Sequence, residues 1–199
     1  MTTIDTEFKW SRGFEYEIGI HEGMRVIRQS SRTRQTFEPL KVPTKLYLAF
    51  SELDGSPEAY VDFARKWGLL EKPADEGAWE FVHVWRSEIK KMKNLIGFVS
   101  MVKTEDGRRL RMEMASLKAF LVSGEPNTRP ALVLQPPSLL EAMKLQLAQS
   151  HASGAALQRC SQPSCGKWFE VGAAGKRSVA KFCSDTCRNR YHYERRAIQ

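Results

Sequence analysis

The stretch "RCSQPSCGKWFEVGAAGKRSVAKFCSDTCRNRYHYERR", residues 159–196, contains all four cysteines of the 199-residue chain. Their spacing is C-x4-C, then a loop of 17 residues, then C-x3-C. In a tetrahedral four-cysteine zinc site, each close pair forms a tight turn that offers two thiolates, and the loop folds one pair onto the other. The stretch therefore predicts one structural zinc ion, with the ligands Cys160, Cys165, Cys183 and Cys187.

The residues around the cysteines fit a small module that a metal ion holds together. Trp168 and Phe169 supply aromatic packing where the chain is too short to build a core of its own. Ser184 is a predicted N-cap of a helix over residues 185–197, which places Cys187 in the first turn, where the helix dipole favours a thiolate. Four cysteines leave no open coordination position, so the predicted metal is structural rather than catalytic.

Other uses of the four cysteines remain open from the sequence. Two disulfides would need an oxidising compartment, which nothing in the sequence indicates, and four unrelated thiols would not cluster in this way. Iron-sulfur ligation also employs four cysteines. Redox use is less favoured, because the chain has no C-x-x-C pair. Zinc is the leading interpretation.

The segments "RCSQPSCGKWFE" and "KFCSDTCRNRYHYERR" resemble the CGNR-type zinc finger of bacterial transcription regulators. The resemblance covers about 40 residues and implies that the four cysteines are the metal ligands, with Asn189 and Arg190 matching the last two letters of the motif. It also implies a helical companion domain that senses a ligand or a stress signal. Two features depart from the family: Arg188 stands where it has glycine, and the second cysteine pair is one residue tighter.

Positive charge is concentrated at the C-terminal end. The net charge is +8, and residues 151–199 contain nine Lys and Arg residues against three acidic ones. Arginines interleaved with aromatic residues on a helix suit contact with phosphates and stacking on bases. We therefore predict a DNA or RNA partner, bound through Lys176, Arg177, Lys181, Arg188, Arg190, Tyr191, His192, Arg195 and Arg196. The alternative is that these charges only solvate a C-terminal helix.

The fold class expected for the whole chain is α+β. Apolar residues make up 42% of it and charged residues 27%, which is typical of a globular protein. We expect a mixed, mainly helical N-terminal domain with a few strands over residues 1–137 and a connecting helix over 138–156. Residues 157–199 are expected to form a treble-clef-like or zinc-ribbon-like four-cysteine module that ends in a basic helix. A small molecule or a protein is a possible partner of the N-terminal domain.

Hydrophobic periodicity predicts the elements of the N-terminal domain. Residues 14–18 alternate like a strand, whereas residues 23–43 show no clean period and are predicted to form a surface loop or an edge strand. Residues 108–124 alternate briefly like a strand, although their second half fits a helix equally well, and "ALVLQPP" fits a short extended segment. Helices are predicted over 44–53, from Pro57 to an end at Gly68 with Ser56 as N-cap, from Trp79 to Val99, and after a cap at Ser138.

The leading functional hypothesis is a transcription regulator or accessory factor with a nucleic-acid-binding zinc finger. The alternative is a protein-interaction module in which the finger is a rigid docking surface. No catalytic motif is recognised, so an enzyme is not expected. No apolar run approaches the roughly 20 residues that cross a bilayer. No signal peptide is visible either, so no membrane partner and a cytoplasmic location are expected.

Overall fold

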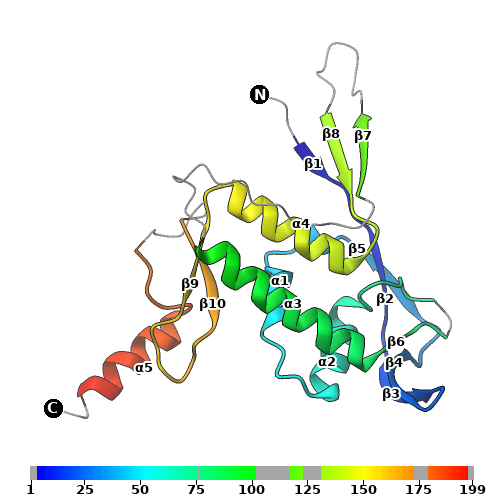
Figure 1. Ribbon diagram of the computed structural model, residues 1–199, viewed down its shortest axis with the longest axis horizontal. Helices are drawn as coiled ribbons and strands as arrows, with labels where there is room; N and C mark the ends of the chain where they lie inside the picture. The colour runs from blue at the N-terminus through cyan, green and yellow to red at the C-terminus, as the bar shows by residue number, and fades with distance from the viewer. Residues whose placement is uncertain (1–3, 76, 102–116, 123–130, 173–178, 197–199) are drawn as a thin grey trace. The chain divides into compact units, whose positions relative to one another are not determined.

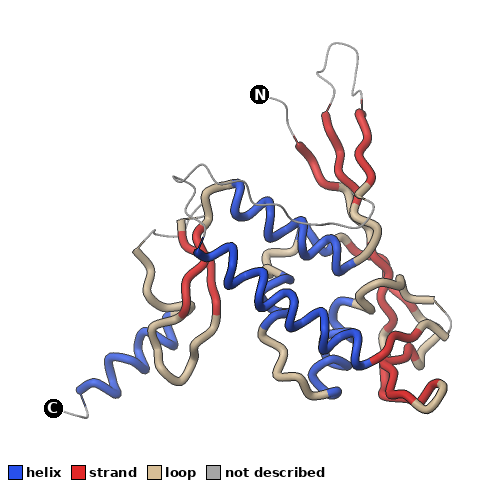
Figure 2. The backbone as a smooth tube through the Cα atoms, viewed as in Figure 1, coloured by secondary structure: helices blue, strands red, loops and turns tan. Residues whose placement is uncertain are grey.

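The computed structural model describes residues 4–75, 77–101, 117–122, 131–172 and 179–196 (Figure 1). Two of the predicted nucleic-acid contacts, Lys176 and Arg177, lie outside these residues. The described part of the chain has the predicted mixed α and β character, with five α-helices and several small sheets (Figure 2). None of its helices combines the length and the apolar character that crossing a membrane requires.

The α-helices are α1 (Leu46–Ser51), α2 (Pro57–Trp67), α3 (Val82–Met101), α4 (Leu139–Ala152) and α5 (Asp185–Arg196), and a short 3-10 helix covers Pro39–Lys41. The strands are β1 (Ile4–Thr6), β2 (Trp10–Gly13), β3 (Tyr16–His21), β4 (Met24–Gln29), β5 (Arg34–Phe37), β6 (Trp79–Phe81), β7 (Lys118–Val122), β8 (Ala131–Gln135), β9 (Ala156–Arg159) and β10 (Trp168–Val171).

The chain divides into two compact units. We call residues 1–92 and 112–146 the N-terminal unit and residues 93–111 and 147–199 the C-terminal unit. The divisions fall within α3 and α4, so each of these helices contributes residues to both units. The whole cysteine-containing stretch belongs to the C-terminal unit.

A three-stranded antiparallel sheet of the N-terminal unit has the order β3-β4-β6. The central strand β4 has two neighbours, and its residues Val26 and Ile27 are buried. The prediction of a surface loop or an edge strand over 23–43 is therefore wrong for β4. Its arginines obscured the pattern: the half-exposed Arg28 forms an ion pair with Glu17 of β3 at 2.7 Å, which lets a charged residue sit in a central strand.

The segment before α3 is also different from the prediction. Residues 79–81 pair with β4 as the strand β6, and the helix begins at Val82 rather than at Trp79. Within this strand Glu80 is buried and Trp79 and Phe81 are half-buried, which is the alternation of a strand. Three residues are too few for that alternation to stand out against the helical period that follows.

Helix α2 agrees with the prediction at both ends. The Ser56 hydroxyl accepts a hydrogen bond from the Ala59 amide at 3.2 Å, and Gly68 ends the helix with a φ of 91°. The side chains of the predicted apolar stripe, Tyr60, Phe63, Ala64 and Trp67, are all buried. The rings of Tyr60 and Phe63 pack at 5.7 and 5.9 Å from the fully buried Trp85 of α3, so this contact forms the centre of the core.

Two further sheets lie in the described part of the N-terminal unit. The strands β1, β8 and β7 lie side by side in that order, with β1 parallel and β7 antiparallel to β8 (Figure 1). The strand β2 pairs with β5 in the second sheet. Of the two alternatives for the second half of residues 108–124, the strand is correct over Lys118–Val122, while residues 108–116 and 123–124 lie outside the described part of the chain. The predicted extended segment "ALVLQ" is confirmed as β8.

Candidate metal centre

The first cysteine pair lies in the loop that joins the antiparallel strands β9 and β10. Cys160 directly follows β9, and its amide donates a hydrogen bond to the Lys167 carbonyl at 2.9 Å, which closes the loop. Inside the loop, the Cys165 amide donates to the Gln162 carbonyl at 2.9 Å. Gly166 has a φ of 59°, a left-handed conformation that glycine adopts without strain, so the chain reverses right after the second cysteine.

The second cysteine pair lies at the start of α5. The Ser184 hydroxyl accepts a hydrogen bond from the Cys187 amide at 3.2 Å, and the Ser184 carbonyl accepts one from the Arg188 amide at 3.1 Å. Ser184 is therefore the N-cap, as predicted, and Cys187 lies in the first turn. The Ser161 amide donates to the Lys181 carbonyl at 2.9 Å, which ties the two cysteine loops together.

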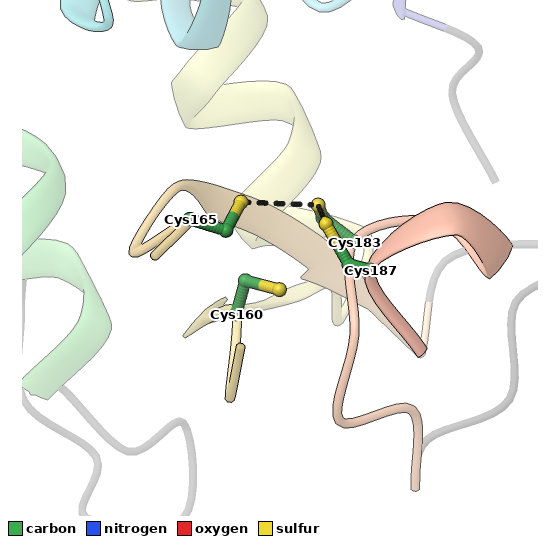
Figure 3. A group of neighbouring side chains, drawn as sticks. All are labelled: Cys160, Cys165, Cys183 and Cys187. Atoms are coloured by element: carbon green, nitrogen blue, oxygen red, sulfur yellow. Dashed lines mark hydrogen bonds between the residues drawn. The ribbon is translucent and has the colours of Figure 1, made fainter. Parts of the chain in front are cut away.

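The four cysteine sulfurs converge on one point, as Figure 3 shows, and all lie within 4.8 Å of one another. The Sγ atoms of Cys165 and Cys183 are 3.7 Å apart, and those of Cys183 and Cys187 are 3.6 Å apart. A disulfide needs about 2.05 Å, so the cysteines are free thiols and the disulfide alternative does not apply. A tetrahedral ion with metal–sulfur bonds of about 2.3 Å needs sulfurs about 3.8 Å apart. The cluster can therefore hold a metal ion, and its geometry is consistent with zinc.

A small apolar core supports the cluster. Cys160 packs with the buried side chains of Phe169 and Val171, and Phe182 covers this core from the segment that leads into the second cysteine pair. Phe169 thus has the packing role predicted for it. Trp168 is half-buried and lies instead beneath the guanidinium of Arg159, which is 4.5 Å from the ring centroid.

The thiols differ in acidity when no metal is bound. Burial, followed by the neighbouring Cys187 and Cys165 thiols, raises the pKa of Cys183 to about 12. Burial also raises the pKa of Cys165. By contrast, a hydrogen bond from the Ser184 hydroxyl, followed by one from Cys183, lowers the pKa of Cys187 to about 7. The metal-free cluster therefore keeps protons at neutral pH that an incoming cation must displace.

The predicted arginines of α5 are all exposed, as is Lys181 just before the helix. Arg188 pairs with Asp185 at 3.2 Å. Arg195 donates a hydrogen bond to the Tyr191 hydroxyl at 3.2 Å and lies over the ring of that residue. The structure thus places Arg188, Arg190, Arg195 and Arg196 on one exposed helix.

The aromatic residues of α5 differ in exposure. The half-buried Tyr191 ring packs on the finger at 5.1 Å from that of Phe182, whereas His192 is exposed and its ring only borders Phe182 at 6.2 Å. Tyr193, which was not among the predicted contacts, is 76% exposed. The spacing from Cys187 could have shown which tyrosine is exposed. Tyr191, four residues after Cys187, returns to the side of the helix that faces the cluster, whereas Tyr193, six residues after it, does not.

A buried amide links the first cysteine loop to the far part of α5. The Gln162 side chain is only 1% exposed, and its Nε2 donates to the Glu194 carboxylate at 2.9 Å and to the Ser164 hydroxyl at 3.0 Å. This contact joins residues 32 positions apart. No local sequence pattern could have revealed it.

No family model matches the chain, and comparisons with curated proteins and with solved structures give no significant match. The resemblance of residues 159–196 to the CGNR-type finger stays a prediction.

Proposed function

We propose that this protein is a nucleic-acid-binding protein of the transcription-regulator type, in which a structural zinc finger contacts DNA or RNA. Its finger is treble-clef-like: a β-hairpin carries the first cysteine pair, and a helix starts at the second. The sulfur separations of 3.6 and 3.7 Å support zinc as the ion. The resemblance to CGNR-type fingers agrees with this assignment.

The observation that carries the proposal is a basic helix with no fully buried side chain. None of the 12 residues of α5 is buried. Packing normally supplies most of the stability of a helix, whereas α5 is held by the cysteine cluster, one buried amide and the contact of Tyr191 with Phe182. We attribute its exposed basic surface to contact with a partner. Within the described residues, Arg190 and Arg196 have no ion-pair partner. They are available for phosphates.

Exposed basic residues lie along more than one side of α5. Arg188, His192 and Arg196 are spaced four residues apart and form a stripe on one side of the helix, and Arg190 lies on another exposed side. Cys187 and Tyr191 lie on the side that contacts the finger. A phosphate backbone that follows this stripe would meet cations along its length and the exposed Tyr193 beside them.

The test is the salt dependence of nucleic-acid binding by the full chain. Affinity for random DNA or RNA, followed by fluorescence anisotropy, is expected to fall linearly with salt on logarithmic axes. Arg190→Ala and Arg196→Ala should each lower the affinity and reduce that slope by about 1, with zinc content unchanged. Arg86→Ala, an exposed arginine of α3, is the control. Undetectable or salt-independent binding would remove the proposal.

A protein partner is the second candidate. Ile20 of β3 and Met24 of β4, on either side of the turn that joins these strands, are 65% and 41% exposed, and a docked protein would cover such apolar side chains. A complex that survives nuclease treatment and the two arginine substitutions, but is lost in Ile20→Lys, would support this function. If the complex instead depended on α5, the finger itself would be the docking surface.

A further inference from the structure

A pocket of about 560 Å³ lies beside the metal cluster, and its lining among the described residues belongs to the C-terminal unit. Its apolar lining comes from Phe169, Phe182, Val179 and Ala180, and its cations are Lys181 and Arg188. Its volume and its mainly apolar lining with a few polar groups are those of a small-ligand site. Of its lining residues, Arg188 also belongs to the α5 stripe.

The charges around the pocket favour an anionic ligand. Asp185 is the acidic residue among the described lining, and it is engaged by Arg188 at 3.2 Å. Lys181 has no ion-pair partner among the described residues. Residues 151–199 as a whole carry three times as many basic as acidic residues, nine against three. A ligand with a flat apolar part and an adjacent negative charge matches both the lining and the cations.

We infer that this pocket receives one unstacked base of single-stranded DNA or RNA, with the neighbouring phosphates at Lys181 and Arg188. The inference rests on the proposed nucleic-acid function and specifies the form of nucleic acid that the finger prefers. The exposed Val179 and the half-buried Phe182 contact the face of the base. Arg188, which replaces the glycine of the resembling family, contributes a pocket charge.

The pocket distinguishes single strands from duplexes for a steric reason. Bases in a duplex are covered on both faces by their neighbours and present only their edges in the grooves. An apolar pocket can be filled only by a base that has left the stack, which is least costly in a single strand. Contacts from the α5 stripe alone would show no such preference, because phosphates are present in both forms.

Two double substitutions separate the pocket from general charge. Lys181→Gln with Arg188→Gln removes two pocket cations, whereas Arg190→Gln with Arg196→Gln removes two cations of α5 that do not line the pocket. The probes are labelled oligo(dT), oligo(U), an abasic strand of equal length and a short DNA duplex, all measured by anisotropy in one buffer. Zinc content and circular dichroism establish that each variant is folded.

The full chain is expected to bind oligo(dT) about tenfold more tightly than the abasic strand, because stacking contributes about that factor or more per base. The pocket variant should lower single-strand affinity about tenfold more than the α5 variant does, and both should affect the duplex equally. If the two double variants changed the affinity for every probe equally, or if the abasic strand bound as tightly as oligo(dT), the inference would be wrong while the nucleic-acid function would still stand. Absence of binding to any probe would remove both. Pocket-dependent binding of poly-glutamate without nucleic-acid binding would replace the base with an acidic protein segment.

Discussion

Glu80 is a buried charged residue of the N-terminal unit, with only 7% of its surface exposed. One carboxylate oxygen accepts the amides of Glu71 and Lys72 at 2.6 and 3.0 Å. The other accepts the Leu70 amide at 2.9 Å and the Trp85 indole at 2.7 Å. A single carboxylate thereby holds the segment after α2 against the start of α3, and four N–H donors satisfy its charge in place of water.

Replacing this carboxylate by an amide should destabilise the N-terminal unit. In Glu80→Gln, the amide NH2 group has to face two N–H donors, which loses two hydrogen bonds and leaves those donors buried. A cost of about 2 to 3 kcal/mol is expected. Chemical denaturation followed by tryptophan emission measures it. Glu15→Gln makes the same change on the surface and should cost almost nothing; equal effects at the two positions would refute this role for Glu80.

Residue-level features were predictable where they depend on near neighbours. Ser56 and Ser184 were identified as caps because each cap bonds an amide three residues further on. The four cysteines were identified as one cluster because only a few ligand spacings fit a tetrahedral ion. The role of Glu80 was not predictable, since an acidic residue between two aromatic residues has no local signature of burial.

At the level of elements, the length and pairing of a segment decide how much of it a sequence pattern reveals. Helix α2 has three turns, so its apolar stripe is repeated and was recognised. Strand β6 has three residues, and the prediction included them in the helix that follows. Strand β4 was wrongly predicted as a loop or an edge strand. Whether a strand is central depends on which strands pair with it, and the sequence of residues 24–29 does not indicate their pairing with the distant β6.

Helix α5 depends on Gln162, and a charge swap can test this anchor. In Gln162→Glu, a buried carboxylate would face the exposed Glu194 carboxylate where the amide now donates to Glu194 at 2.9 Å. We expect a loss of about 1 to 3 kcal/mol of stability in the C-terminal unit. In the double variant with Glu194→Gln, an amide donor again faces a carboxylate acceptor, so much of the lost stability should return. Thermal unfolding followed by helical circular dichroism is the measurement; a double variant no better than Gln162→Glu alone would contradict the anchor.

At the scale of the whole molecule, metal binding is linked to pH. Burial raises the pKa of Cys183 to about 12 in the metal-free cluster, so this thiol must lose a proton when the ion binds. Metal affinity should therefore rise with pH and weaken on acidification. The dependence should steepen below about pH 7, where the Cys187 thiol is also protonated and has to release its proton. Competition with a chromophoric chelator at several pH values measures this, and an affinity that does not change with pH would contradict it.

Metal removal should unfold the finger and spare the N-terminal unit. The apolar core beside the cysteines has three buried residues, whereas the N-terminal unit is built on a large core that includes Trp85. A structural zinc ion supplies about 10 to 16 kcal/mol of binding energy to its module, which three residues cannot replace.

The chain has five tryptophans, and Trp168 is the one in the C-terminal unit, so Trp168→Phe leaves emission from the N-terminal unit alone. A chelator with reductant should lower the helical circular dichroism while the emission of this variant stays constant, and Cys183→Ser should give the same result without chelator. A parallel loss of both signals would show that the two units fold as one.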